Sequence, residues 1–460
     1  MGEGKKKIIP QTDKIDFPAL QEVKRFSPIE IKGTIIKVKS EVLEVEIPGG
    51  VNAQLISFGS SGIGEIINCS GRSCTVAPIT AGLLLSVRVG GSCKLLLDSD
   101  QFIIGEAILG SVVGACFEEL YRFSKNEAPA DSETDRLNPQ RVGYHKCSPS
   151  PFERTEIRQQ LVTGIKAIDA FVPIGVGQRL AVIAEPGVGK SSLLQALALR
   201  ANADVSVIAL IGERGREVGE FVAAIEAAGF GSKVVIVSAT SDECAARRKY
   251  AALAAQRIAE YFRDQGKSVL LLVDSLSRWA RSMRDLSAAC GDKPVRKGYS
   301  AETFTALPRL LERAGTSSHG AITALYTILA TSDLDEDPMV EEVRSLTDGH
   351  ILLSRSRSER GIYPAVDILR SLSRVASSIV TKEFLGTIGA IKRLLSYAER
   401  DKDLVLLGGN TNSELTAAIE LERKTDEFVS QYGNEYVDLE KTKLWVISRA
   451  KAISRQPSEI

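Results

Sequence analysis

The residues best suited to chemistry in this 460-residue sequence lie in the run AEPGVGKSS, residues 184–192. Gly187 and Gly189 leave backbone amides free to turn toward phosphate oxygens, because neither residue carries a Cβ. Lys190 then places a positive charge on the outer phosphates, and the hydroxyl of Ser191 is a ligand for Mg²⁺. An apolar run precedes this turn and a helical pattern follows it, which is the context in which such loops bind nucleoside triphosphates.

One position departs from the strict pattern of these loops, since Ala184 stands where glycine is usual. Alanine fills this place if its φ is negative, so we expect the loop to form. We predict that it binds ATP together with Mg²⁺. The residues expected to contact ATP are Glu185, Pro186, Gly187, Val188, Gly189, Lys190, Ser191 and Ser192.

Two carboxylates follow apolar runs that are typical of buried strands. SVLLLVD (268–274) ends in Asp274, and Glu213 comes two residues after VSVIALI (205–211). Ligands of α/β sheets gather at the carboxyl ends of the strands. We therefore expect Asp274 to hold the magnesium side of the site and Glu213 to polarise the attacking water.

The charged run that contains Glu213, IGERGREVGEF (211–221), supplies two further candidates. We expect Arg214 to contact the γ-phosphate and Glu217 to support the magnesium ion from behind its direct ligands. The same residue types would suit a solvated charged turn, and their spacing alone does not separate the two interpretations.

The elements that must position these residues begin at Gln178, where apolar runs alternate with helical patterns. The strand candidates are residues 179–184, 205–211, 233–239, 268–274 and 321–329. The first four are apolar almost throughout, as in strands buried on both faces, and helical stretches such as 190–200 and 243–263 lie between them. This order predicts an α/β domain with a mainly parallel sheet.

Different patterns flank this region. Between Ile29 and Leu97, short runs with period-two alternation are bounded by turn residues, which predicts a small β-barrel or sandwich. After Val375 the strand signals stop, and helical spacing predicts a bundle of helices. The expected domains are a flexible arm (1–27), a β-barrel (28–97), a connector (98–150), an α/β nucleotide-binding domain (151–375) and a helical domain (376–460).

Composition narrows the possible classes of protein. Lysine plus arginine and aspartate plus glutamate both number 58, so no excess charge favours nucleic acid or an anionic membrane as a general partner. No apolar run approaches the roughly 20 residues that span a bilayer, and the first residues lack the apolar stretch of a secretory signal. Seven scattered cysteines, with Cys69 and Cys74 the only close pair, and three dispersed histidines give no zinc pattern. We expect reduced thiols in a cytoplasmic protein.

Residues 150–375 resemble the catalytic domain of the rotary ATPase superfamily, and in particular the type III secretion and flagellar export ATPases. The similarity rests on ordered motifs that include TGIKAIDAFVPIGVGQR, AEPGVGKSS, IGERGREVGEF, LLLVDSLSRWA, KGYSAETFTALPRLLERAG, DGHILLSR and IYPAVDILRSLSR. Alanine at position 184 is common in the export branch. The similarity is looser at both ends, and LGSVVGACFEEL (109–120) departs from the glycine-rich turn that relatives carry there.

This resemblance implies a RecA-like ATPase domain in a homohexameric ring that hydrolyses ATP with Mg²⁺ to energise protein export. It implies catalytic roles for Lys190, Glu213 and Arg214, and metal-side roles for Ser191, Asp274 and Glu217. It also places Arg278 near the nucleotide and Tyr363 on the adenine. Arg374 would be an arginine finger that reaches the nucleotide of the neighbouring subunit.

The implied partners are identical subunits, stalk-like and stator-like subunits of the export apparatus, secretion chaperones and cargo proteins, at the periphery of the inner membrane. Three alternatives share parts of the pattern. A catalytic subunit of a rotary ATP synthase or proton pump would need an acidic stalk-contacting segment, and 376–460 shows no such cluster. A non-catalytic nucleotide-binding subunit would be expected to lack Glu213. An RNA-translocating motor would need a basic, aromatic stripe on the barrel.

Overall fold

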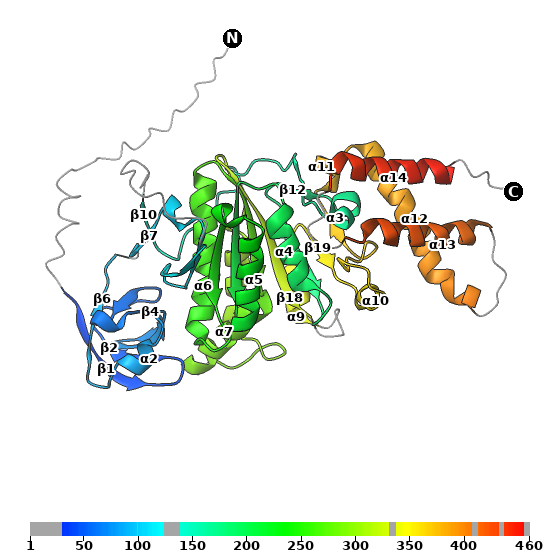
Figure 1. Cartoon of the computed structure of the whole chain (residues 1–460). Coiled ribbons are helices and arrows are strands. Elements are labelled where there is room, and N and C mark those ends of the chain that lie inside the picture. The colour runs from blue at the N-terminus through cyan, green and yellow to red at the C-terminus, as the bar shows by residue number, and fades with distance from the viewer. Residues whose placement is uncertain are drawn as a thin grey trace, which may run out of the picture.

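The computed structural model describes residues 30–98, 100–123, 139–330, 337–406, 413–431 and 437–454. Three parts follow one another along the chain: a β-barrel, a sheet covered by helices on both faces, and a group of long helices (Figure 1). The expected fold class, with a small barrel, a mainly parallel central sheet and a C-terminal helical bundle, is confirmed. The expected arm, 1–27, lies outside the described residues.

Six short antiparallel strands close into the barrel in the order β1-β2-β5-β4-β3-β6. Alternate side chains such as Leu43 and Val45 point inward and are fully buried, which explains the period-two pattern of the sequence. The strands are β1 (Lys32–Val38), β2 (Leu43–Glu46), β3 (Leu55–Ser57), β4 (Ile63–Ser70), β5 (Ser73–Pro78) and β6 (Ser92–Leu95), with a short helix, α2 (Leu83–Ser86), before β6.

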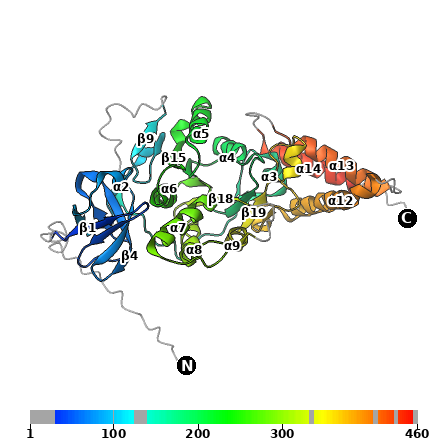
Figure 2. The same cartoon turned by 90° about the horizontal axis from the view of Figure 1, so that it is seen from below.

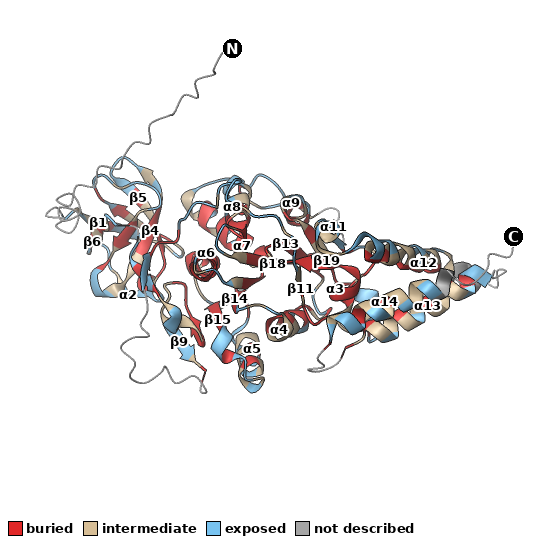
Figure 3. Cartoon of the chain, turned by 90° about the horizontal axis from the view of Figure 1, so that it is seen from above, coloured by how far each residue is buried: buried red, intermediate tan, exposed pale blue. Residues whose placement is uncertain are grey.

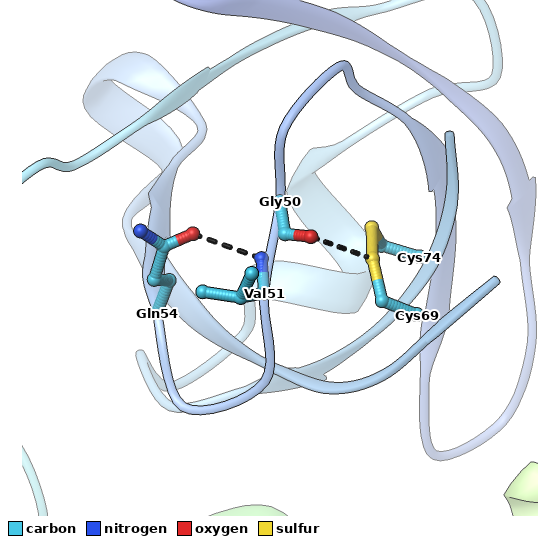
Figure 4. Close-up of a disulfide and its surroundings, with 5 residues drawn as sticks. All are labelled: Gly50, Val51, Gln54, Cys69 and Cys74. Atoms are coloured by element: carbon cyan, nitrogen blue, oxygen red, sulfur yellow. Dashed lines mark hydrogen bonds between the residues drawn. A yellow bond between two sulfur atoms is a disulfide. The ribbon is translucent and has the colours of Figure 1, made fainter. Parts of the chain in front are cut away.

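One expectation about the barrel is wrong, because Cys69 and Cys74 form a disulfide (Figure 4). The two residues face one another across the β4–β5 hairpin, with their Cα atoms 4.2 Å apart. The Sγ of Cys69 also lies 3.2 Å from the carbonyl oxygen of Gly50. The tight hairpin brings the pair together, and no feature of their spacing identified them as opposed residues. The other five cysteines are free.

The central sheet has the strand order β20-β19-β13-β18-β16-β14-β15-β8-β9. The strands from β19 to β8 run parallel to one another, as the apolar runs predicted for five of them. The bounds are β8 (Ser111–Val113), β9 (Glu119–Arg122), β13 (Arg179–Ala184), β14 (Val205–Ile211), β15 (Val234–Ala239), β16 (Ser268–Asp274), β18 (Ala321–Leu329), β19 (Gly349–Leu352) and β20 (Leu372–Ser373), and β17 (Gly315–Thr316) pairs with β18.

Helices cover both faces of this sheet, so its strands are buried on both sides (Figures 2 and 3). One face packs against α6 (Ala245–Asp264), α7 (Leu276–Cys290), α8 (Ala301–Leu311) and α9 (Pro338–Leu346). The other face packs against α3 (Lys166–Phe171), α4 (Lys190–Arg200) and α5 (Gly215–Ala227). The two faces form two separate hydrophobic clusters, as expected when alternate side chains of a strand point to opposite sides.

The run 109–120, which departs from the relatives' pattern, forms part of the central sheet. Its strand β8 pairs in parallel with β15, and β9 turns back along β8 as the edge strand. Two small two-stranded sheets accompany the chain on its way into the central domain: β7 (Phe102–Ile104) with β10 (Gln140–Val142), and β11 (Gln160–Leu161) with β12 (Ile174–Gly175).

Two short helices precede the C-terminal bundle: α10 (Arg355–Glu359) lies between β19 and β20, and α11 (Ala376–Ile379) follows β20. The bundle consists of α12 (Lys382–Leu406), α13 (Ser413–Val429) and α14 (Leu439–Ser454). Phe428 and Trp445 stack between α13 and α14 with their ring centroids 3.9 Å apart. Within the described part of the chain, no helix has the length and apolar character needed to cross a membrane.

Candidate active site

Four neighbouring strands carry the expected site residues to the same edge of the sheet. These strands lie in the order β13, β18, β16 and β14. Ala184 at the end of β13 lies opposite Leu329 of β18, and Asp274 at the end of β16 lies opposite Leu210 of β14. Because these strands are parallel, their carboxyl ends coincide and the loops that leave them converge. The residues that the sequence places after three separate strands therefore meet in space.

The turn between β13 and α4 has the backbone that phosphate binding requires. Gly187 and Gly189 adopt φ values of +85° and +90°, which residues with a side chain rarely adopt. Ala184 ends β13 and is not among the described non-glycine residues with positive φ, so alanine fits this place. Helix α4 starts at Lys190, directly after the turn, and presents the free N–H groups of its first residues to this edge.

Lys190, Glu213 and Asp274 form one buried charge cluster. The Nζ of Lys190 contacts Oδ1 of Asp274 and lies 3.5 Å from Oε1 of Glu213. All three side chains are at least nine-tenths buried, with residue exposures of 8%, 5% and 3%. Thr327 of β18 donates its hydroxyl to the same Asp274 oxygen at 2.8 Å. The structure thus brings together three residues that the sequence spreads over 85 positions, and adds Thr327, which the sequence did not single out.

Arg278, in the first turn of α7, holds Glu213 from the other side. Its Nη2 donates to Oε2 of Glu213 at 3.0 Å, and its Nη1 donates to the carbonyl oxygen of Gly212. Both carboxylate oxygens of Glu213 thus face a cation. Arg278 was expected near the nucleotide, and its described contacts are with the residue expected to activate water.

The pKa of Glu213 is raised to about 7, chiefly because burial disfavours the charged carboxylate. The cation of Lys190 opposes this shift, whereas the nearby carboxylate of Asp274 reinforces it. A hydrogen bond with Glu217 also raises the pKa, which places the Glu217 carboxyl beside Glu213. A carboxyl group that titrates near neutral pH is well matched to accepting a proton during a reaction at neutral pH.

The oxygen donors at this edge fit the magnesium of a bound nucleotide. The Ser191 hydroxyl is exposed at the start of α4, and Asp274 and Glu217 supply carboxylate oxygens nearby. Mg²⁺ uses one or two protein carboxylates, substrate phosphates and waters rather than a complete protein cage. The described residues contain no group of three or more His, Cys, Asp or Glu side chains that could hold a metal by itself.

Tyr363 lies beside the phosphate-binding turn. A Cβ built on Gly189 would approach its ring to 3.2 Å, and its hydroxyl lies 2.8 Å from the hydroxyl of Ser358. Its backbone oxygen accepts a hydrogen bond of 2.7 Å from the N–H of Gln431, which follows the end of α13. The amide side chain of Gln431 is buried and bonds to the backbone of residues 164 and 166. Gln431 was missed, because nothing in its own segment shows this long-range contact.

Two predicted residues have mainly peripheral contacts. Arg214 is largely exposed and reaches only Glu217 among the described acidic residues, at 3.8 Å. Glu185, in the turn itself, accepts a bond of 3.5 Å from Nη1 of Arg355 in α10. Neither contact assigns a role to these residues.

Arg374 lies at the other end of the sheet from the turn. β20 pairs with Gly349 and His350, which form the amino end of β19. Arg374 is the residue directly after β20, and its backbone N–H donates to the carbonyl oxygen of Asp348. β19 runs parallel to β13, whose carboxyl end leads into the turn. The guanidinium of Arg374 is exposed and donates to the carbonyl oxygen of Arg344 at 3.4 Å.

Comparison with known proteins agrees with this geometry. Residues 164–373 match the nucleotide-binding domain of the ATP synthase alpha/beta family. The chain is 37% identical over 425 residues to a flagellum-specific ATP synthase of Treponema pallidum, covering 90% of this chain and 92% of that protein. It is 43% identical over 305 residues to the SPI-1 type 3 secretion system ATPase of Salmonella typhi, covering 66% and 69%.

The fold agrees with a solved assembly as well. The structure of the assembled ATPase EscN with its central stalk EscO, from the type III secretion system of enteropathogenic E. coli, matches with a TM-score of 0.78. The two chains are 34% identical, and the match covers 91% of this chain and all of the other.

Proposed function

Since the chain belongs to the type III secretion and flagellar export ATPases of the ATP synthase alpha/beta family, we propose that it hydrolyses ATP with Mg²⁺ in a homohexameric ring. The ring energises the unfolding and export of proteins through a flagellar or virulence secretion apparatus. The observation that carries this proposal is the buried contact of Lys190 with both Asp274 and Glu213 at the edge where the phosphate-binding turn lies.

Each residue of the cluster has a distinct part in the reaction. The turn 185–189 and Lys190 bind and orient the phosphates, with Ser191 and Asp274 on the magnesium side and Glu217 behind them. A bound magnesium ion supplies positive charge that stabilises the transferred phosphoryl group. Glu213 accepts a proton from the attacking water at Oε1 or Oε2, and Arg278 fixes the direction of that carboxylate.

The site is completed by a second copy of the chain. Arg374 neutralises charge that develops on the γ-phosphate bound to its neighbour, as an arginine supplied in trans does in related chemistry. Arg374 and the phosphate-binding turn lie at opposite ends of the sheet, which supports this role. In a closed ring with head-to-tail packing, the end that carries Arg374 in one subunit faces the end that carries the turn in the next. Arg214 supports the γ-phosphate, and Tyr363 stacks on the adenine.

The proposed partners follow from the relatives. The EscN structure contains a central stalk, and a stalk-like subunit that occupies the ring's centre is proposed here too. Stator-like subunits, secretion chaperones and cargo proteins complete the set. The ring works in the cytoplasm at the periphery of the inner membrane, next to the export machinery.

The test is steady-state phosphate release from ATP by the purified chain, with and without Mg²⁺, next to sedimentation of the same sample. The intact chain should hydrolyse ATP only with Mg²⁺ and sediment as a hexamer when nucleotide is present. Lys190→Ala should lose hydrolysis, whereas Lys233→Ala, on a lysine outside the site, should keep it. Equal hydrolysis by Lys190→Ala and the intact chain would refute the proposal.

A further inference from the structure

A cavity of about 490 Å³ lies between α6, α7, α8 and residues 145–148. None of the residues assigned to the nucleotide site lines it. Its size is within the range of small-molecule pockets, roughly 300–1,000 Å³. The proposed hydrolysis uses none of the residues that line this cavity.

The floor of the cavity is apolar and comes from three helices. Its residues are Leu253 of α6, Trp279 and Met283 of α7, and Ala306 and Leu310 of α8. Trp279 is 2% exposed, and within the described part of the chain its indole N–H has no hydrogen-bond acceptor. A buried indole N–H normally finds an acceptor. Within the described part of the chain this donor is unsatisfied, and Trp279 lines the cavity.

The rim of the cavity carries an excess of positive charge. Four cations line it, Lys146, Lys249, Arg309 and Arg313, against a single carboxylate, Glu302. The first and the last of these cations are neutralised by acids outside the lining: Lys146 pairs with Asp264, and Arg313 pairs with Glu260.

The other two cations, Lys249 and Arg309, form no ion pair with any described residue. The Nζ of Lys249 lies 3.4 Å from the Tyr250 hydroxyl, and its charge lowers the pKa of the buried Glu65 carboxyl. Arg309 is exposed at the mouth of the cavity. Two cations beside an apolar floor match a ligand with an anionic group at one end.

We propose that this cavity is a binding site for a small amphipathic anion. The aromatic or other apolar body of the ligand lies against Trp279 and Met283, and its sulfonate, carboxylate or phosphate group lies between Lys249 and Arg309. This proposal does not depend on the proposed export function, because it rests on the cavity and its charges alone.

The test uses 8-anilinonaphthalene-1-sulfonate and its uncharged counterpart N-phenyl-1-naphthylamine as probes. The chain has two tryptophans, so Trp445→Phe leaves Trp279 as the only one. Excitation of this variant should transfer energy from Trp279 to the bound sulfonate dye, with saturation at about one dye per chain. Lack of transfer from Trp279 would overturn the proposal, since it would place the dye elsewhere.

Substitutions then separate the two ends of the site. The double variant Lys249→Ala, Arg309→Ala should lower the affinity for the sulfonate dye at least about tenfold. It should change the affinity for the uncharged dye by less than about twofold. Arg158→Ala, on an exposed arginine remote from the lining, should change neither. Equal weakening of both dyes, or no weakening of the sulfonate dye, would contradict the anionic specificity.

A third variant tests the apolar floor. Ala306→Phe fills the cavity and should abolish energy transfer from Trp279 to either dye, and circular dichroism shows whether this variant is folded. If it does not fold, the double alanine variant alone decides. Loss of dye binding when the subunits assemble would also overturn the proposal, because the occupant would then be a second copy of the chain.

Discussion

Lys190 and Arg374 lie at opposite ends of the central sheet, Lys190 beyond the carboxyl end of β13 and Arg374 beside the amino end of β19. The two strands are neighbours and parallel, so the separation of these residues follows from the register itself. A single copy therefore does not bring its own Arg374 to its own phosphate-binding turn. In the proposed ring, head-to-tail packing would bring Arg374 of one copy to the phosphate-binding turn of the next.

Glu213→Gln should separate binding from hydrolysis. The amide keeps the shape of the side chain and its contact with Arg278, but it does not accept the proton of the attacking water. We expect ATP affinity within a few fold of the intact chain and turnover lower by roughly a hundredfold or more. Measurement of nucleotide binding and phosphate release on the same preparation checks this. Normal turnover by this variant would show that Glu213 does not activate the attacking water.

The pH dependence of hydrolysis should follow the ionisation of Glu213. Its pKa is raised to about 7, so the carboxylate that accepts the proton is present above this pH and is lost below it. We expect kcat/KM to rise with pH through a midpoint near 7 and to fall about tenfold per pH unit well below it. A flat profile between pH 5.5 and 8 would contradict the assignment.

The same ionisation should appear in stability. A carboxyl whose pKa is higher in the folded state than in the unfolded state binds more protons when folded. Its contribution to the free energy of unfolding therefore decreases as pH rises from about 4.5 to about 7. Denaturant titrations of the intact chain and of Glu213→Gln should therefore diverge over this range, with the variant relatively more stable at the higher pH.

Gln431→Ala should affect ATP binding more than the chemical step. The side chain bonds to the backbone of residues 164 and 166, while its backbone N–H holds the Tyr363 oxygen. Loss of the amide removes one buried and one partly buried hydrogen bond to the backbone, at a cost of about 1–3 kcal/mol. We expect KM for ATP to rise several fold with kcat nearly unchanged. Ser430→Ala, which loses only a bond within α13, is the control.

Gly349→Ala should displace the strand that carries Arg374. An added Cβ would lie 2.3 Å from the backbone oxygen of Leu372 and 3.1 Å from Cα of Ser373, and the φ of +148° is unfavourable for alanine. We expect a loss of about 1–3 kcal/mol in stability and a fall in kcat of at least about tenfold, with ATP affinity retained. Gly386→Ala, whose Cβ meets nothing within 4 Å, should change neither value.

The sequence predicted the core of the sheet closely, and the reason is physical. Strands β13, β14, β16 and β18 are buried on both faces, so nearly all of their positions are apolar or small. The predicted ranges coincide with the observed ones. Strand β8 escaped prediction because it has only three residues, too few to show a period. The disulfide between Cys69 and Cys74 depended on hairpin register, which the sequence did not define.

For the site, the sequence predicted residues that end a strand or follow one closely, and it left out residues that contact them from other elements. Asp274 and Glu213 were predictable because parallel strands bring their carboxyl ends together. Thr327 lies inside a strand, and Gln431 comes from another part of the chain, so only the folded structure connects them to Asp274 and Tyr363. The place of Arg374 opposite the turn likewise depends on the pairing of β19 with β20.

The most direct test of the central claim, that the site is completed between copies, is hydrolysis by mixed rings. Arg374→Ala and Lys190→Ala should each be inactive alone while still assembling. Random mixing in equal amounts gives about one quarter of the interfaces an intact turn from one variant and an intact Arg374 from the other. We predict that phosphate release returns to a comparable fraction of the intact chain's rate. If no mixing ratio restores hydrolysis although sedimentation shows mixed rings, Arg374 does not act in trans.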